Sequence, residues 1–303
     1  DVYHTGNWPH EPVDFSGKRV GVIGTGSSAI QSIPLIAEQA QQLYVFQRTP
    51  NYSVPAQNAP MNPDLQRRLK ARYPEFRQQN KQMMIGWGAR HPRNEGFVFD
   101  MEPEEREQQF ERHWQMGGLL FIGAFGDLVV DEEANEQACE FVRRKIRGVV
   151  KEPAVAERLS PDSRIFCKRL CADTQYFETY NRDNVHLVDV KADPIVEITE
   201  SGLRTNQEEY SLDCLVYATG FDAMTGALER MDIRGRSGQS LKQKWAEGPR
   251  TYLGLETSGF PNLFTITGPG SPSVLTNMLP SIEQHVDFIS ECIAYMRERQ
   301  LRV

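Results

Sequence analysis

One glycine-rich turn limits the folds open to this chain more than any other feature of its sequence. The turn, Gly24–Ala29 (GTGSSA), follows a short apolar run with β-branched residues at Lys18–Gly24, which predicts a buried strand. Helical spacing of apolar residues over Ala29–Gln41 predicts a helix, and Leu43–Thr49 predicts a second strand that Pro50 closes. A strand, a turn, a helix and a strand in this order form a βαβ unit with parallel strands and a right-handed crossover. The sequence therefore predicts an α/β chain with a Rossmann-like dinucleotide-binding fold.

The spacing of small residues in this turn is that of a phosphate-binding loop. The first glycine, Gly24, allows a tight turn, and the second, Gly26, lets the backbone approach a pyrophosphate. Ala29 at the third position allows the helix to pack closely against the strand. The free amides and the dipole of the helix N-terminus favour negative phosphates. An ordinary glycine turn is the alternative, and the strand and helix on either side favour dinucleotide binding.

The end of the second predicted strand indicates which dinucleotide binds. Sites for NAD place an acidic residue there for the ribose 2′-hydroxyl, whereas an arginine suits the 2′-phosphate of NADP. Here the strand ends in Arg48 and Thr49, and no acid is present. The guanidinium of Arg48 offers a planar fork of donors, and Thr49 offers a hydroxyl. The sequence therefore favours NADP, with a solvated surface arginine as the alternative reading of Arg48.

Residues 60–156 have a different character from the segments around them. They carry long polar segments with helical composition at Pro63–Lys81, Glu102–Gln115 and Glu132–Val149. This stretch is too long for a loop, so we predict a helical insertion within a nucleotide-binding domain of residues 1–220. Residues 221–303 are predicted to be part of a second domain. Further elements are predicted as strands at Val185–Val190, Ile195–Ile198, Leu203–Thr205, Leu212–Thr219 and Asn262–Ile266, and as a helix at Pro280–Arg299.

The composition argues against several classes of protein. With 41 acidic and 34 basic residues the formal net charge is −7, which disfavours non-specific binding of nucleic acid. No apolar stretch reaches the ~18 residues of a membrane span, and the first residues do not resemble a signal peptide. Five cysteines without a Cys-x-x-Cys pair predict neither a disulfide framework nor a zinc site, and no histidines are spaced as metal ligands. We therefore expect no metal, no nucleic-acid or membrane partner, and a place in the reducing cytoplasm.

Four further motifs resemble those of one family of flavoproteins. They are His4-x-x-x-Trp8-Pro9 before the glycine turn, Cys167–Leu170 (CKRL) followed by Tyr180–Val185 (YNRDNV), Ala218–Asp222 (ATGFD), and Phe260–Phe264 (FPNLF) with Gly268–Pro272 and Asn277-Met278. Together they make the chain resemble the Baeyer–Villiger monooxygenases over essentially its whole length.

The resemblance implies an enzyme that binds FAD and NADPH and uses O2 to insert one oxygen atom next to a ketone carbonyl, giving an ester or a lactone. It implies that Arg169 is the catalytic arginine, whose permanent charge stabilises a C4a-peroxyflavin. It gives Lys168 a contact with the 2′-phosphate, and it gives His4 and Trp8 a role in coupling domain geometry to cofactor position. The residues implied to bind cofactors are Gly24, Thr25, Gly26, Ser27, Ser28, Ala29, Gln31, Arg48, Thr49 and Lys168 for NADP, and Thr219, Gly220, Asp222 and Met278 for FAD.

Part of the family's pattern lies outside these 303 residues. A first glycine turn for the FAD adenosine and a C-terminal part are not found, so residues 221–303 are expected to form only part of a FAD-binding domain. We expect these residues alone to bind FAD poorly and to lack oxygenase activity, and we expect a monomer. Two alternatives stay open: an N- or S-oxidising flavin monooxygenase, and a non-catalytic NADP-binding module.

Overall fold

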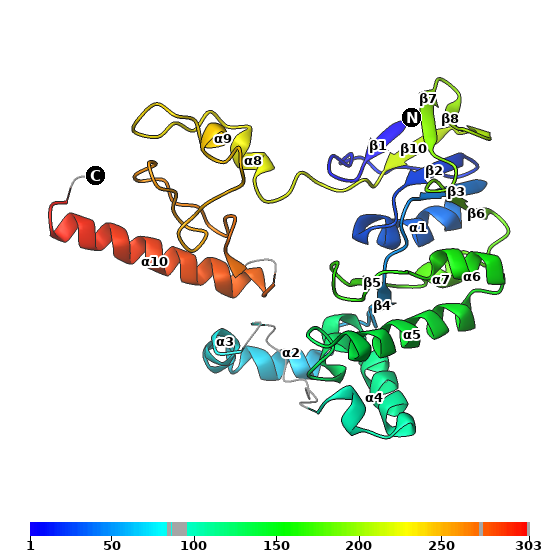
Figure 1. Cartoon of the computed structure of the whole chain (residues 1–303), viewed down its shortest axis with the longest axis horizontal. Coiled ribbons are helices and arrows are strands. Elements are labelled where there is room, and N and C mark those ends of the chain that lie inside the picture. Colours follow the sequence, from blue (N-terminus) through cyan, green and yellow to red (C-terminus); the bar gives the residue numbers. More distant parts are fainter. Residues whose placement is uncertain (84–85, 87–95, 273–274, 302–303) are drawn as a thin grey trace. The chain divides into compact units, whose positions relative to one another are not determined.

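The computed structural model describes residues 1–83, 86, 96–272 and 275–301 (Figure 1). Its contacts divide the chain into two compact units. The first unit comprises Asp1–Ala59 with His91–Gly220, and the second comprises Pro60–Arg90 with Phe221–Val303, in each case as far as the residues are described. Each unit has a buried hydrophobic cluster of its own.

A parallel sheet of five strands forms the centre of the first unit. Every pairing in it is parallel. In spatial order the strands are β1 (Val2–His4), β10 (Cys214–Tyr217), β2 (Arg19–Ile23), β3 (Gln42–Gln47) and β6 (Val185–Asp189). Helix α1 (Ser27–Gln39) connects β2 to β3, and the turn between β2 and α1 is the predicted glycine turn. The α/β Rossmann-like fold is therefore confirmed.

The strands and the helix of this sheet bury their apolar side chains in one core. The central strands β2 and β3 are buried along most of their length, as expected for parallel strands covered on both faces. Helix α1 buries one stripe, which includes Ile30, Ile33 and Ile36, against the sheet. These side chains form one continuous core with Val20 and Val45 of the strands.

The rest of the first unit is mainly helical. Its elements are β4 (Ser53–Pro55), η1 (Val98–Asp100), α4 (Pro103–Met116), η2 (Gly118–Ala124), α5 (Glu132–Val149), α6 (Pro153–Leu159), β5 (Cys171–Asp173) and α7 (Tyr176–Thr179), and β4 pairs in parallel with β5. An aromatic cluster joins α4, η2 and α5, with ring centroids of Phe110 and Phe121 5.8 Å apart and those of Phe121 and Phe141 5.7 Å apart. A small antiparallel sheet of β7 (Ile195–Thr199), β8 (Gly202–Thr205) and β9 (Glu209–Ser211) precedes β10.

The second unit contains α2 (Pro63–Lys70), α3 (Tyr73–Lys81), α8 (Gly226–Glu229), α9 (Leu241–Lys244) and α10 (Met278–Glu298). Its core is small and is built around Leu241, Trp245 and Phe260. Along α10 several apolar side chains are exposed, including Val286 (42%) and Ile293 (44%). None of the helices in the described part of the chain combines the length and apolar character needed to cross a bilayer.

Two predictions about the elements need correction. The helix predicted over Pro63–Lys81 is two helices, α2 and α3, and the second begins beside Pro74, which lacks an amide hydrogen. The strand predicted at Asn262–Ile266 is wrong: Asn262 has a positive φ of 62°, and the segment makes only one isolated bridge, at Phe264.

The contact-based units also differ from the predicted insertion. Residues 60–90 group with the second unit, because Arg77 of α3 forms an ion pair with Glu283 of α10 and Asn277 donates a hydrogen bond to the Gly86 carbonyl. Only the later helices, α4 to α6, lie within the first unit. The assignment of the NADP-binding and FAD-binding domains to these parts stays a prediction.

Truncation of Phe121 tests the aromatic cluster. Phe121 is fully buried, so Phe121→Ala should reduce the free energy of unfolding by about 3–5 kcal/mol. Its neighbour Ile122 is 38% exposed and serves as the control, since Ile122→Ala should cost less than about 1 kcal/mol. Chemical denaturation of both variants measures the difference, and equal losses would show that the cluster is not the centre of this core.

Candidate nucleotide site

A cleft with a volume of about 530 Å³ opens at the carboxyl ends of β2, β3 and β10. This edge of an open parallel sheet is where such folds bind ligands. The residues that line the cleft are Ile23–Gly26, Phe46, Arg48–Asn51, Lys168, Val190, Ile195 and Ala218–Gly220. The structure therefore brings the glycine turn, the end of the second strand and the lysine of the CKRL motif into one cavity.

The two glycines of the turn have different structural roles. Gly24 has a φ of 110°, and a Cβ added to it would lie 2.5 Å from the carbonyl oxygen of Ala218. A Cβ on Gly26 would meet no protein atom within 4 Å. Gly24 is therefore required by the protein's own packing, whereas Gly26 leaves open the space that a pyrophosphate would fill. Ala29 is fully buried between helix and sheet, as the third position of the turn requires.

The N-terminus of α1 offers free amides to the cleft. Its N-cap residue is Gly26, which has no side chain to accept hydrogen bonds, and the first turn of the helix contains no acidic residue. The side-chain amide of Gln31 donates to the Ser27 carbonyl at 3.0 Å, so it does not occupy the free backbone amides. Thr25 donates from its hydroxyl to the Thr49 carbonyl at 2.9 Å, which ties the turn to the end of β3. The helix end is thus arranged as an anion site.

The charge of the cleft is positive, although the chain as a whole is acidic. Arg48 and Lys168 both line it, and its lining contains no aspartate or glutamate. Both cations are exposed, and within the described residues neither side chain forms a hydrogen bond or an ion pair. Two unpaired cations beside a helix N-terminus fit a ligand with several phosphates.

The pairing of β4 with β5 places the CKRL motif at the cleft, and the sequence analysis missed it. The Cys171 amide donates to the Tyr52 carbonyl at 3.1 Å, and the Asn51 amide group donates to the Cys171 sulfur at 3.2 Å. Burial raises the pKa of the Cys171 thiol, and a hydrogen bond with Ser27 of the glycine turn opposes this rise. The two strands have three residues each and are far apart in sequence, so neither gives a local pattern from which it could be predicted.

Arg169 occupies a different position from its neighbour. It is exposed, and it is not among the residues that line the cleft. Its carbonyl accepts a contact from the Cys171 thiol at 3.9 Å, and its guanidinium has no partner among the described residues. The cation is therefore available to a ligand or to a further part of the protein, and its assigned catalytic role stays a prediction.

The residues assigned to FAD are divided between the two units. Thr219 and Gly220 line the cleft of the first unit. Asp222 belongs to the second unit and forms an ion pair with Arg230 at 3.3 Å. Met278 is the first residue of α10 and is 44% exposed. The contact of these four residues with FAD stays a prediction.

His4 and Trp8 lie next to the sheet. His4 ends β1, and its Nδ1 accepts a hydrogen bond from the Gly6 amide at 2.9 Å. The ring of Trp8 packs against Tyr3 and Phe15, with centroids 5.6 and 6.3 Å away. Both residues therefore order the segment that leads into β2, in a position from which they contact no catalytic group of the described chain.

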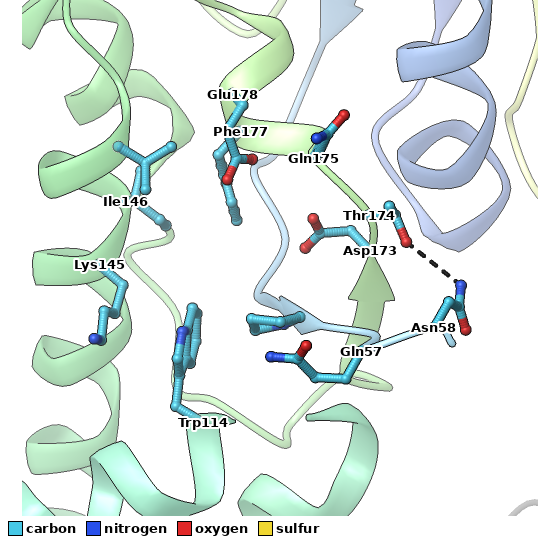
Figure 2. Close-up of a pocket in the computed structure, with 12 residues that line it drawn as sticks. Gln57, Asn58, Trp114, Lys145, Ile146, Asp173, Thr174, Gln175, Phe177 and Glu178 are labelled. Atoms are coloured by element: carbon cyan, nitrogen blue, oxygen red, sulfur yellow. Dashed lines mark hydrogen bonds between the residues drawn. The ribbon is translucent and has the colours of Figure 1, made fainter. Parts of the chain in front are cut away.

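A second cavity, of about 380 Å³, has the opposite chemistry (Figure 2). It lies between α5 and the end of β5, and its lining includes the carboxylates of Asp173 and Glu178 and the ring of Trp114. Lys145 also faces it, but this ammonium forms an ion pair with Glu111. The cavity has no glycine turn and carries unneutralised acid, so it does not suit a dinucleotide.

Comparison with known proteins confirms the resemblance found in the motifs. No protein-family model matches the chain. The chain is 44% identical over 98% of its length to a Baeyer–Villiger monooxygenase of Pseudooceanicola batsensis, and 42% identical over 99% of its length to cyclohexanone 1,2-monooxygenase of an Acinetobacter species. It covers 54% and 55% of these two proteins, so it spans about half the length of the curated relatives it matches.

The solved structures agree with the curated proteins. The structure of an oxidized steroid monooxygenase bound to NADP matches with a TM-score of 0.91 and 53% identity, over 99% of this chain and 57% of that one. One relative has a different activity in its name: phenazine N-monooxygenase of Lysobacter antibioticus is 39% identical over 97% of this chain and 54% of its own length.

The contrast between the two glycines gives a matched pair of variants. Gly24→Ala should lower the free energy of unfolding by about 1–3 kcal/mol or more, because an L-residue is strained at this φ and would overlap the Ala218 carbonyl. Gly26→Ala should change stability by less than about 1 kcal/mol, yet weaken NADP+ binding by about tenfold, roughly 1.4 kcal/mol. Thermal unfolding and NADP+ titration of both variants distinguish the two roles. Unchanged NADP+ affinity in a folded Gly26→Ala variant would place the phosphates elsewhere.

Asp173 should make the folding stability of the protein depend on pH. Burial raises the pKa of this carboxyl group, although hydrogen bonds from Ser53 (2.5 Å) and from the Tyr176 amide (3.1 Å) oppose the rise. The stability that the protonated Asp173 contributes is present below its unfolded pKa of about 4 and is lost as the pH rises through its higher folded pKa. Asp173→Asn keeps both partners, so its stability relative to the wild type should increase over this pH range. Denaturation curves at several pH values measure this, and a constant difference between the two proteins would contradict it.

Proposed function

We propose that this chain comprises the NADP-binding domain and part of the FAD-binding domain of a Baeyer–Villiger monooxygenase, which uses NADPH, FAD and O2 to convert a ketone into an ester or a lactone. The observation that carries the proposal is the cleft, in which a glycine turn, a helix N-terminus and two unpaired cations meet without any carboxylate. Relatives of the whole chain named as Baeyer–Villiger and cyclohexanone monooxygenases support the same activity.

The cleft accounts for the choice of NADPH over NADH. The amides at the start of α1 would hold the pyrophosphate in the space beside Gly26. Arg48 and Lys168 would then bind the 2′-phosphate, the one group that distinguishes the two nucleotides. Val190 and Ile195 add an apolar wall to the same cleft, which suits the adenine ring.

Arg169 would be the catalytic residue of the reaction. FAD, when bound, supplies the chemistry that activates oxygen. The guanidinium of Arg169 is charged at every working pH, so it would stabilise negative charge that develops during oxygen transfer without giving up a proton. Its exposure and the lack of a described partner are consistent with a group that meets its ligand only in the assembled enzyme.

The remaining assigned residues would hold the cofactors and the domains. Thr219 and Gly220 would lie along the FAD, with Asp222 and Met278 contributing from the second domain, and residues 221–303 would form part of that FAD-binding domain. His4 and Trp8 would couple the position of this domain to the nucleotide. We further propose a monomeric protein of the cytoplasm that binds the ketone and O2 and has no nucleic-acid or membrane partner.

N-oxidation is the second candidate, because a phenazine N-monooxygenase is among the relatives. Both activities need the same nucleotide cleft, so the cleft does not separate them. Assays of the full-length protein with cyclic and aryl ketones and with aromatic N-heterocycles do so: oxidation of the heterocycles without any ester from the ketones would favour N-oxidation.

Two neighbouring substitutions separate nucleotide binding from oxygen transfer in the full-length enzyme. Lys168→Ala should raise KM for NADPH about tenfold with little change in kcat, because it removes binding to the 2′-phosphate. Arg169→Ala should keep anaerobic consumption of NADPH within a few-fold and reduce ester formation by about 10²–10³-fold. Stopped-flow and product assays measure the two steps. Ester formation by Arg169→Ala at the parental rate would refute the catalytic role of this arginine.

A further inference from the structure

The loop that leads to Lys168 is held by four side chains with no role in the proposed function. These four, here called the carbonyl ladder, are Tyr52, Asn135, Cys139 and Arg143. Three of them lie at i, i+4 and i+8 on α5 and therefore on one face of the helix. Tyr52 directly precedes β4. The exposed fraction is 3% for Tyr52, 6% for Asn135, 0% for Cys139 and 15% for the Arg143 side chain.

The ladder fixes alternate carbonyl groups of the loop at residues 161–165. The shortest of these bonds run from Arg143 Nε to Pro161 O at 2.9 Å, from the Tyr52 hydroxyl to Ser163 O at 2.8 Å, and from Asn135 Nδ2 to Ile165 O at 3.0 Å. The Tyr52 hydroxyl also lies 3.3 Å from Pro161 O. The Ile165 amide also donates to the sulfur of Cys139 at 3.3 Å. Arg143 Nη2 donates to the Tyr52 hydroxyl at 3.2 Å, so two side chains of the carbonyl ladder also bind each other.

The order of the contacts shows that the loop runs antiparallel to α5. Asn135, Cys139 and Arg143 lie about one turn apart along the helix. They contact the carbonyl groups of Ile165 (3.0 Å), Ser163 (3.9 Å) and Pro161 (2.9 Å) in that order. The contact therefore extends along two helical turns.

Lys168 and Arg169 follow shortly after Ile165, the last loop residue that the carbonyl ladder contacts. Phe166 has a positive φ of 69°, which turns the chain away from α5. Lys168 then lines the cleft, and its side chain has no partner among the described residues. No side-chain contact of its own therefore fixes the lysine, and its place depends on the backbone that precedes it and on β5 that follows.

We propose that Tyr52 and Arg143 are positioning residues for nucleotide recognition: through the carbonyl ladder they set where Lys168 stands in the cleft, and so set the preference for a 2′-phosphate. The inference rests on the proposed binding of NADP. The ladder acts on Lys168 through the loop, so its removal should change selectivity between nucleotides rather than binding of every nucleotide.

Binding of 2′,5′-ADP and of 5′-AMP to the full-length protein tests this, because the two probes differ in the 2′-phosphate. Tyr52→Phe removes only the hydroxyl and should weaken binding of 2′,5′-ADP about fivefold, with 5′-AMP binding unchanged within about twofold. Arg143→Lys keeps the charge beside Glu136 but not the planar fork, and should act in the same direction.

Two control variants remove similar bonds that do not reach the loop. Tyr180→Phe removes a buried hydroxyl that donates to the Tyr176 hydroxyl at 2.9 Å. Arg147→Lys alters an arginine one turn further along α5, which forms an ion pair with Glu140 at 2.9 Å. Tyr180→Phe should lower Tm as the ladder variants do, whereas Arg147→Lys should change Tm little because its ion pair is exposed. Both controls should leave the ratio of the two dissociation constants unchanged.

A double-mutant cycle with Lys168→Ala gives the decisive result. If the ladder acts through Lys168, Tyr52→Phe should have no further effect on 2′,5′-ADP binding in the Lys168→Ala background. Equal effects in both backgrounds, or unchanged selectivity in both ladder variants, would overturn the inference and leave NADP binding intact. A wild-type protein that does not bind 2′,5′-ADP more tightly than 5′-AMP would overturn the proposed function together with the inference.

Discussion

The nucleotide cleft depends on the close approach of two backbone segments, Gly24 after β2 and Ala218 at the end of β10. The positive φ of Gly24 and the 2.5 Å between a Cβ built there and the Ala218 carbonyl leave no room for a side chain. Because β10 pairs directly with β2, this approach also brings Thr219 and Gly220 to the edge at which α1 begins. A turn near the start of the chain and a segment far along it therefore form one cavity.

The second constraint on the cleft is electrostatic. The chain has a net charge of −7, yet the described residues that line the cleft include two cations and no carboxylate. Charges further than about 8 Å are largely screened at physiological ionic strength, so the acidic remainder of the surface has little effect on a bound phosphate. The local absence of acid, rather than the overall charge, is what makes this edge of the sheet an anion site.

The sequence predicts the parts of the fold that local patterns determine. The unit β2–α1–β3 follows from an apolar run, a glycine turn and helical spacing within thirty or so residues, and its parallel sheet is confirmed. The same local pattern predicts Arg48 and the turn residues as a nucleotide site, and Gly24, Thr25, Gly26 and Arg48 line one cleft. The strand prediction at Asn262–Ile266 was wrong, because a short apolar run predicts a strand even where no partner strand lies beside it.

Contacts distant in sequence account for what the sequence does not reveal. Asn51 and Cys171, 120 residues apart, come together only because β4 and β5 pair, and each of those strands is too short to be recognised alone. The CKRL motif was recognisable by resemblance, but its place at the cleft depends on that pairing. The same pairing separates the two cations: Lys168 lines the nucleotide cleft and Arg169 does not. Under the proposed roles, this short motif would contact the nucleotide through Lys168 and leave Arg169 for the reaction.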